Sequence, residues 1–97
     1  MAHSALVAGV GMIKFSKPGA NEPYEIMASK AIRAALEDAG VGVEQVQQAF
    51  GAFCMSDSCS AQRSLYELGM PGIPVFNLNN ACASGSSAIF PAWSAVP

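Results

Sequence analysis

Short apolar runs alternate with segments of helical spacing along this chain, and the alternation leaves few folds open. Residues 5–10, 46–53 and 73–78 are apolar runs of strand length, suited to burial on both faces of a sheet. Pro74 lacks an N–H, so the third strand is expected at a sheet edge or paired only from Val75 onward. With helices between them, these strands predict an α/β fold in the order β-α-β-α-β-α with a mostly parallel sheet.

The first helix has the clearest boundaries. Asn21 can cap it, Pro23 suits its first turn, and Gly40 ends it. Between them, apolar residues recur at three-and-four spacing: Tyr24, Met27, Ala28, Ala31, Ile32, Ala35, Leu36 and Ala39.

Two shorter helices are expected after it. Asp57 or Ser58 could cap the second, which Gly69 closes. Small residues at 81–88 begin the third, and Pro91 is expected to stop it after a couple of turns.

Composition excludes several functional classes. The chain is 52% hydrophobic and 12% charged, with a net charge of -2 and scattered basic residues, so neither nucleic acid nor a membrane surface is an expected partner. The apolar run at 5–13 contains two glycines and is too short to span a bilayer. Without Lys or Arg in residues 1–4, no secretory signal is expected, so a cytoplasmic location is expected by default. Three cysteines, an odd number without a framework spacing, indicate reduced thiols and not a disulfide scaffold.

Three motif-like features are set aside. Residues 9–11 resemble the start of a dinucleotide fingerprint, but Lys14 occupies the third glycine position. Cys54 and Cys59 lack a second pair of zinc ligands, so no metal is expected. We interpret Cys54 as a small core residue at a strand end and Cys59 as lying near a helix start. His3 lies in a terminal segment, where a catalytic role is not expected.

Cys82 is the candidate catalytic residue. It follows the strand at 73–78 and the turn Asn79-Asn80, which places it in the expected first turn of the third helix. Unpaired N–H groups and the helix dipole favour a thiolate there and can receive an oxyanion. The arrangement is mechanically like the nucleophile elbow of hydrolases, with Cys in place of Ser. The alternative is a buried cysteine in a tightly packed helix of small residues.

Residues 79–88, Asn-Asn-Ala-Cys-Ala-Ser-Gly-Ser-Ser-Ala, resemble the nucleophile segment of thiolases. Three upstream stretches are similar to the sterol carrier protein type of thiolase: residues 7–12 with Lys14-Phe15, Gln62-Arg63, and the Gly-Met-Pro-Gly-Ile-Pro-Val run at 69–75. The resemblance extends from residue 5 to about residue 90. Residues 1–97 are therefore interpreted as a partial, amino-terminal thiolase domain in which 91–97 depart from the pattern.

The resemblance implies a thiolase fold of two similar α/β halves, acting on 3-oxoacyl-CoA in lipid or sterol side-chain metabolism. Cys82 would take the acyl group as a thioester, and coenzyme A would collect it as cosubstrate. No bound cofactor is implied and no cofactor-binding residue is assigned. Dimers are usual in the family, which implies a homodimer or a partner subunit through the strand at 73–78.

The family's catalytic His and second, acid/base Cys lie beyond Pro97, so the chain alone is expected to be inactive. Three classes of function stay open. The first is a thiolase-type acyltransferase of which this chain carries the nucleophile. The second is a related condensing enzyme, similar to 3-oxoacyl synthases. The third is a non-catalytic truncated fragment or partner subunit.

Overall fold

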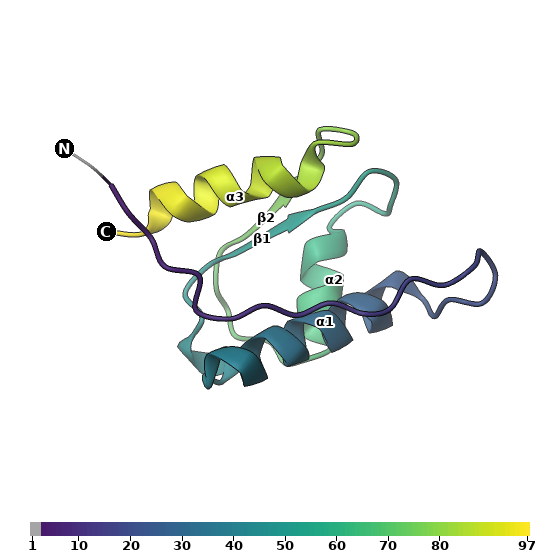
Figure 1. Cartoon of the computed structure of the whole chain (residues 1–97), viewed down its shortest axis with the longest axis horizontal. Helices are drawn as coiled ribbons and strands as arrows, with labels where there is room; N and C mark the ends of the chain where they lie inside the picture. The colour runs from purple at the N-terminus through teal and green to yellow at the C-terminus, as the bar shows by residue number, and fades with distance from the viewer. Residues whose placement is uncertain (1–2) are drawn as a thin grey trace.

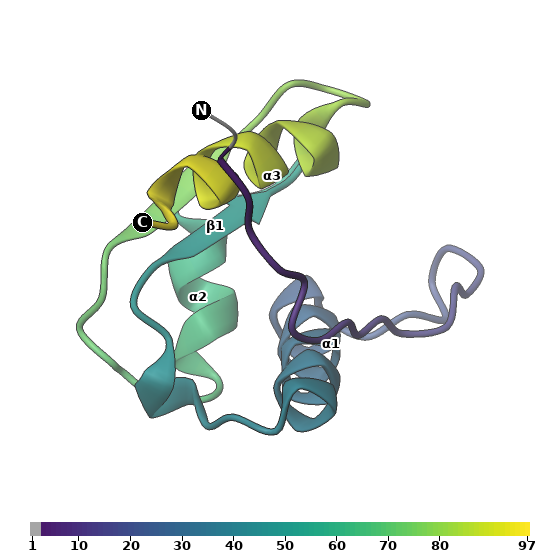
Figure 2. The same ribbon diagram turned by 60° about the vertical axis from the view of Figure 1, so that its left-hand side comes forward.

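A parallel pair of strands lies between helices at the centre of the structure (Figure 1). The computed structural model describes residues 3–97. Its elements are α1 (Tyr24–Ala39), the 3-10 helix η1 (Val43–Gln45), β1 (Ala49–Ala52), α2 (Ser60–Tyr66), β2 (Val75–Leu78) and α3 (Ser84–Ala95). Helix α3 covers one face of the β1–β2 pair and α2 the other, while α1 packs against α2 (Figure 2). The α/β class with parallel pairing is confirmed.

Alternating side chains give the two faces of the sheet different partners. Phe50 and Phe76 lie opposite each other in register, and their rings stack with centroids 5.1 Å apart. With Phe90 of α3, they line one apolar groove. Gly51 faces α2, and a Cβ at this position would collide with the Cβ of Ala61. The sheet is therefore aromatic toward α3 and closely packed toward α2.

Both strands are shorter than the apolar runs that predicted them. The run at 46–53 forms a strand only from Ala49, after two glutamines. The run at 73–78 pairs from Val75 onward, as expected from the missing N–H of Pro74. The carbonyl of Pro74 still accepts the N–H of Ala49 at 3.0 Å, so this proline closes the ladder.

Helix α2 begins differently from the prediction. Its N-cap is Cys59, in a left-handed conformation with φ 61°, and neither Asp57 nor Ser58 caps it. Instead, the side-chain oxygen of Asn77 in β2 accepts the N–H of Ala61 at 2.8 Å. The first-turn N–H groups of a helix have no partner within the helix. Here a side chain from the neighbouring strand accepts one of them, in place of a cap residue.

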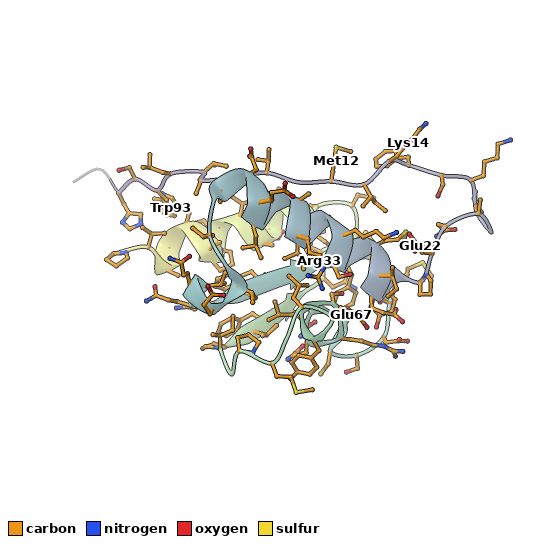
Figure 3. All side chains as sticks on the ribbon, turned by 90° about the horizontal axis from the view of Figure 1, so that it is seen from below. Met12, Lys14, Glu22, Arg33, Glu67 and Trp93 are labelled. Atoms are coloured by element: carbon orange, nitrogen blue, oxygen red, sulfur yellow. The ribbon has the colours of Figure 1, made fainter. Side chains whose placement is uncertain are left out.

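Helix α1 matches the sequence prediction closely. It ends at Gly40, whose left-handed backbone (φ 71°) lets the N–H of the next residue, Val41, reach the carbonyl of Leu36 at 3.1 Å. At its start the N-cap is Pro23 and not Asn21, and no side chain caps it. The guanidinium of Arg33 donates to the carbonyl of Glu67 beyond the end of α2, at 2.9 Å, and ties the two helices together (Figure 3).

The expected strand at residues 5–10 is wrong. This segment runs along α1, outside the β1–β2 sheet (Figures 1 and 2). Gly9 lies so close to the helix that a Cβ there would come within 2.6 Å of the N atom of Ala39. Leu6 and Val7 remain 95% and 83% exposed. A strand needs a neighbouring edge for its ladder of hydrogen bonds, and within residues 3–97 this segment lies beside a helix instead.

The expectation that Pro91 stops the third helix is also wrong, because α3 continues through it to Ala95. Proline removes one hydrogen bond, to the carbonyl four residues earlier, but its fixed φ remains helical. Phe90 and Pro91 line the groove against the aromatic face of the sheet, together with Phe50 and Phe76. Near the end of α3, the indole N–H of Trp93 donates to the carbonyl of His3 at 3.2 Å (Figure 3).

Little of the apolar surface is covered. Leu65 and Ala88 are the buried apolar residues of the described chain, and many large apolar side chains are exposed, among them Leu6, Val7, Val10, Met12 and Phe15. None of the helices formed by residues 3–97 is both long enough and apolar enough to cross a membrane.

Candidate active site

Cys82 lies where the loop after β1 meets the turn after β2, just before α3. The helix begins at Ser84 with Ala83 as its N-cap, so the expectation that Cys82 falls inside the first turn is wrong. The cause is the turn itself, in which Ala81 adopts a left-handed backbone (φ 46°) and delays the helix. The Cys82 side chain is exposed, unlike the buried packing cysteine that was the alternative.

Two asparagines connect this turn to its surroundings. The side-chain amide of Asn79 donates to the carbonyl of Cys54, in the loop after β1, at 3.0 Å. The backbone N–H of Asn80 donates to Oγ of Ser84 at 2.7 Å, and its side-chain amide donates to Oγ of Ser87 at 2.9 Å. The turn is therefore fixed to the β1 loop on one side and to the first turn of α3 on the other.

The start of α3 offers hydrogen-bond donors to a negative charge. Among the described residues, the N–H groups of Gly85 and Ser86 donate to no protein acceptor. Helix α3 also has no acidic residue in its first turn. A Cβ built on Gly85 meets no atom within 4 Å, so the space around this residue is open. A thiolate or an oxyanion at Cys82 would meet the positive end of the helix dipole without competition from a carboxylate.

Of the other candidate residues, one cysteine reaches the turn that carries Cys82, and the rest lie elsewhere. The Cys54 thiol comes to the same turn and donates to the carbonyl of Ala81 at 2.8 Å. It is exposed, so its interpretation as a core residue is wrong. Cys59 lies at the start of α2, as expected. His3 is at the opposite end of α3 from Cys82, where its ring packs edge-on against Trp93 with centroids 4.6 Å apart. Residues 3–97 contain no cluster of three or more metal-ligating side chains.

Ser84 is the residue of this site that the sequence analysis missed. It is only 3% exposed, and its hydroxyl bonds to backbone groups of both loops that surround Cys82. The sequence signal that could have identified Ser84 is its position, two residues after the candidate nucleophile and first in the helix.

No protein-family model matches the chain. Over 86 residues the chain is 46% identical to the non-specific lipid-transfer protein-like 2 of Caenorhabditis elegans, covering 87% of this chain and 21% of that protein. It is 47% identical over 87 residues to sterol carrier protein 2 of Homo sapiens, covering 87% of this chain and 16% of that protein. The chain thus spans about a fifth to a sixth of the length of these curated relatives.

Among solved structures, the chain is similar to the priming β-ketosynthase from the R1128 polyketide biosynthetic pathway. The TM-score is 0.64 at 29% sequence identity, covering 86% of this chain and 25% of that one. The match identifies the arrangement of helices and parallel strands as part of a thiolase-like ketosynthase fold.

Proposed function

Because this chain is homologous to the amino-terminal, thiolase-like part of sterol carrier protein 2, we propose that it supplies the nucleophile for acyl transfer between a 3-oxoacyl-CoA and coenzyme A. Cys82 is the proposed nucleophile. The observation that carries the proposal is its exposed thiol two residues before α3, in a helix start where the N–H groups of Gly85 and Ser86 are unpaired.

In the proposed reaction, the Cys82 thiolate attacks the 3-oxo carbonyl, and donors at the site receive the oxyanion. The bond between C2 and C3 breaks, and the departing enolate of the acyl-CoA takes up a proton. The acyl group stays on sulfur as a thioester until the thiol of coenzyme A attacks it and releases the new acyl-CoA. The exposed Cys82 thiol and the N–H groups at the start of α3 fit the first of these steps, the attack of the thiolate on the carbonyl.

The remaining steps need a base and an acid/base group that this chain does not provide. Its one histidine, His3, contacts Trp93 and not Cys82. By the thiolase resemblance, we propose that a His and a second Cys outside residues 1–97 supply these groups. We also propose lipid metabolism as the setting, the cytoplasm as the compartment, and a homodimer or a partner subunit formed through the open edge of β2.

A condensing enzyme is the second candidate, favoured by the likeness to a priming β-ketosynthase. Condensation uses the same cysteine thioester but forms the carbon–carbon bond where thiolysis breaks it. The identity of 45% over 92 residues to sterol carrier protein 2 of Gallus gallus, against 29% to the ketosynthase, supports the thiolytic class.

The test is acyl capture. The chain is incubated with acetyl-CoA, whose acetyl group can exchange directly onto a cysteine thiol with release of coenzyme A, then digested and searched by mass spectrometry for an acetyl group on each cysteine. We expect the adduct on Cys82, its loss in Cys82→Ala, and its retention in Cys59→Ala. An adduct that persists in Cys82→Ala would contradict the proposal.

A further inference from the structure

Three donors converge on a single carbonyl, that of Ala81, immediately before Cys82. Oγ of Ser84 lies 2.7 Å from this oxygen, the N–H of Ser84 donates to it at 3.2 Å, and the Cys54 thiol donates to it at 2.8 Å. Ala81 is also one of two non-glycine residues in residues 3–97 with a positive φ. Such a conformation is unfavourable for an L-residue, so it persists only where the surroundings hold it.

The Ser84 hydroxyl is the centre of this arrangement. It accepts the N–H of Asn80 at 2.7 Å, and it lies 3.0 Å from the carbonyl of Phe53 at the end of β1. Its one proton is therefore shared between the carbonyls of Phe53 and Ala81. Because the side chain is buried, water does not replace these bonds when the hydroxyl is removed.

We infer that Ser84 is a positioning residue for Cys82, with the Cys54 thiol as a second donor to the same carbonyl. The hydrogen bonds to the Ala81 carbonyl hold Ala81 in its left-handed conformation. Because Cys82 is the next residue, they also determine where its side chain lies. Rotation at Ala81 would swing the nucleophile away from the start of α3, and small displacements of a reacting group are costly for catalysis. The inference rests on the proposed function, since positioning has meaning only for a reacting thiol.

A matched control lies in α1. The hydroxyl of Ser29 donates to the carbonyl three residues earlier, Ile26, at 2.9 Å, the same local pattern as Ser84 to Ala81. Ser29 is 5% exposed, so it is buried like Ser84, and it bonds to neither Ala81 nor Phe53. Removing its hydroxyl tests the general cost of losing a buried helix serine without touching the turn.

The experiment compares Ser84→Ala, Ser84→Thr and Ser29→Ala in the full 97-residue chain. The HN–Hα coupling of Ala81 by NMR reports φ, and limited iodoacetamide labelling gives the ratio of Cys82 to Cys59 alkylation. We expect Ser84→Ala to move Ala81 out of the left-handed region and to lower the ratio about fivefold, the effect of losing one hydrogen bond. Ser84→Thr should restore both readouts, and Ser29→Ala should leave both unchanged.

If Ser84→Ala unfolds, as shown by loss of its far-UV circular dichroism signal, variants of the exposed Cys54 test the inference instead. Cys54→Ala should shift the Ala81 coupling and lower the Cys82 ratio by about twofold, because a thiol is a weaker donor, and Cys54→Ser should reverse both changes. An unchanged Ala81 coupling in folded Ser84→Ala, or in Cys54→Ala where the first variant unfolds, overturns the inference. Failure of acyl capture by the unaltered chain would instead contradict the proposed function, so the two failures are distinguishable.

Discussion

The three cysteines of this chain differ in the hydrogen bonds around them, although all three are free and exposed. Cys82 precedes a twelve-residue helix in which the N–H groups of Gly85 and Ser86 are unpaired. The Cys54 thiol already donates to a carbonyl. Cys59 caps a seven-residue helix in which the N–H of Ala61 is taken by Asn77. These differences in local environment predict different reactivities.

We expect Cys82 to react fastest with a limiting amount of iodoacetamide, because a thiolate there gains the most from an unoccupied helix start. Mass spectrometry of the three cysteine peptides measures the order. Faster labelling of Cys54 or Cys59 at neutral pH would contradict the assignment of Cys82 as nucleophile. Cys82→Ala, labelled in parallel, shows whether the other two thiols react independently.

For single residues, the sequence predicted where Cys82 lies but not which contacts fix its position. The order of strand, asparagine turn and small-residue helix was sufficient to place the thiol near the start of α3. The role of Ser84 depends on the carbonyl of Phe53, thirty-one residues earlier in the chain. A contact of this kind leaves no periodic pattern in the sequence.

Among the elements, the packing of α2 on β1 depends on the absence of a side chain at residue 51. Gly51→Ala should destabilise the fold by about 1 to 3 kcal/mol, because the new methyl group meets the Cβ of Ala61. Gly85→Ala is the matched control, since a Cβ there meets open space in a helix. It should be neutral or stabilising by up to about 1 kcal/mol. Urea titration followed by circular dichroism gives both values, and equal midpoints for the two variants would refute the packing argument.

Helix α3 gives a second test. Pro91→Ala restores an N–H that can donate to the carbonyl four residues earlier, and it removes the clash of the ring with that turn. We expect α3 to be stabilised, by up to about 3 kcal/mol. A higher melting temperature with unchanged secondary structure is the predicted measurement. A lower melting temperature would mean that the ring contributes more by packing near Phe90 than it costs in the helix.

The elements that the sequence predicted well are those whose signals are local. Helix α1 shows a continuous apolar stripe and a glycine end, and β2 begins one residue after a proline. The failures depended on neighbours. Residues 5–10 have the composition of a buried strand, but pairing depends on an edge that composition does not specify. The continuation of α3 past Pro91 brings this proline to a groove that the aromatic face of the sheet also lines.

For the molecule as a whole, the exposed apolar surface is the dominant property. Residues 5–15 contact α1 on one side, while Met12 points away from the helix (Figure 3). The sheet has two strands and therefore two open edges. Patches and edges of this kind promote association. We expect the isolated chain to bind a hydrophobic dye and to self-associate, as measured by sedimentation velocity. A monodisperse monomer with a sharp cooperative melt would be the contrary result.

Catalytic turnover is also a property of the whole molecule. We expect no measurable thiolytic turnover from this chain alone, because general acid and base groups each contribute about a hundredfold to ten-thousandfold. The assay follows the loss of acetoacetyl-CoA absorbance with added coenzyme A, with Cys82→Ala as the control. Turnover that disappears in Cys82→Ala would show that the chain contains a base that its structure does not reveal.

The contact between His3 and Trp93 has a practical consequence. Trp93 is the only tryptophan, and its ring is held by a residue from the start of the described chain, ninety positions away. Its fluorescence emission therefore responds to the release of the leading segment from the end of α3. Detachment that precedes global unfolding should change the fluorescence while the circular dichroism stays the same, and it can be followed without attaching a dye to any thiol.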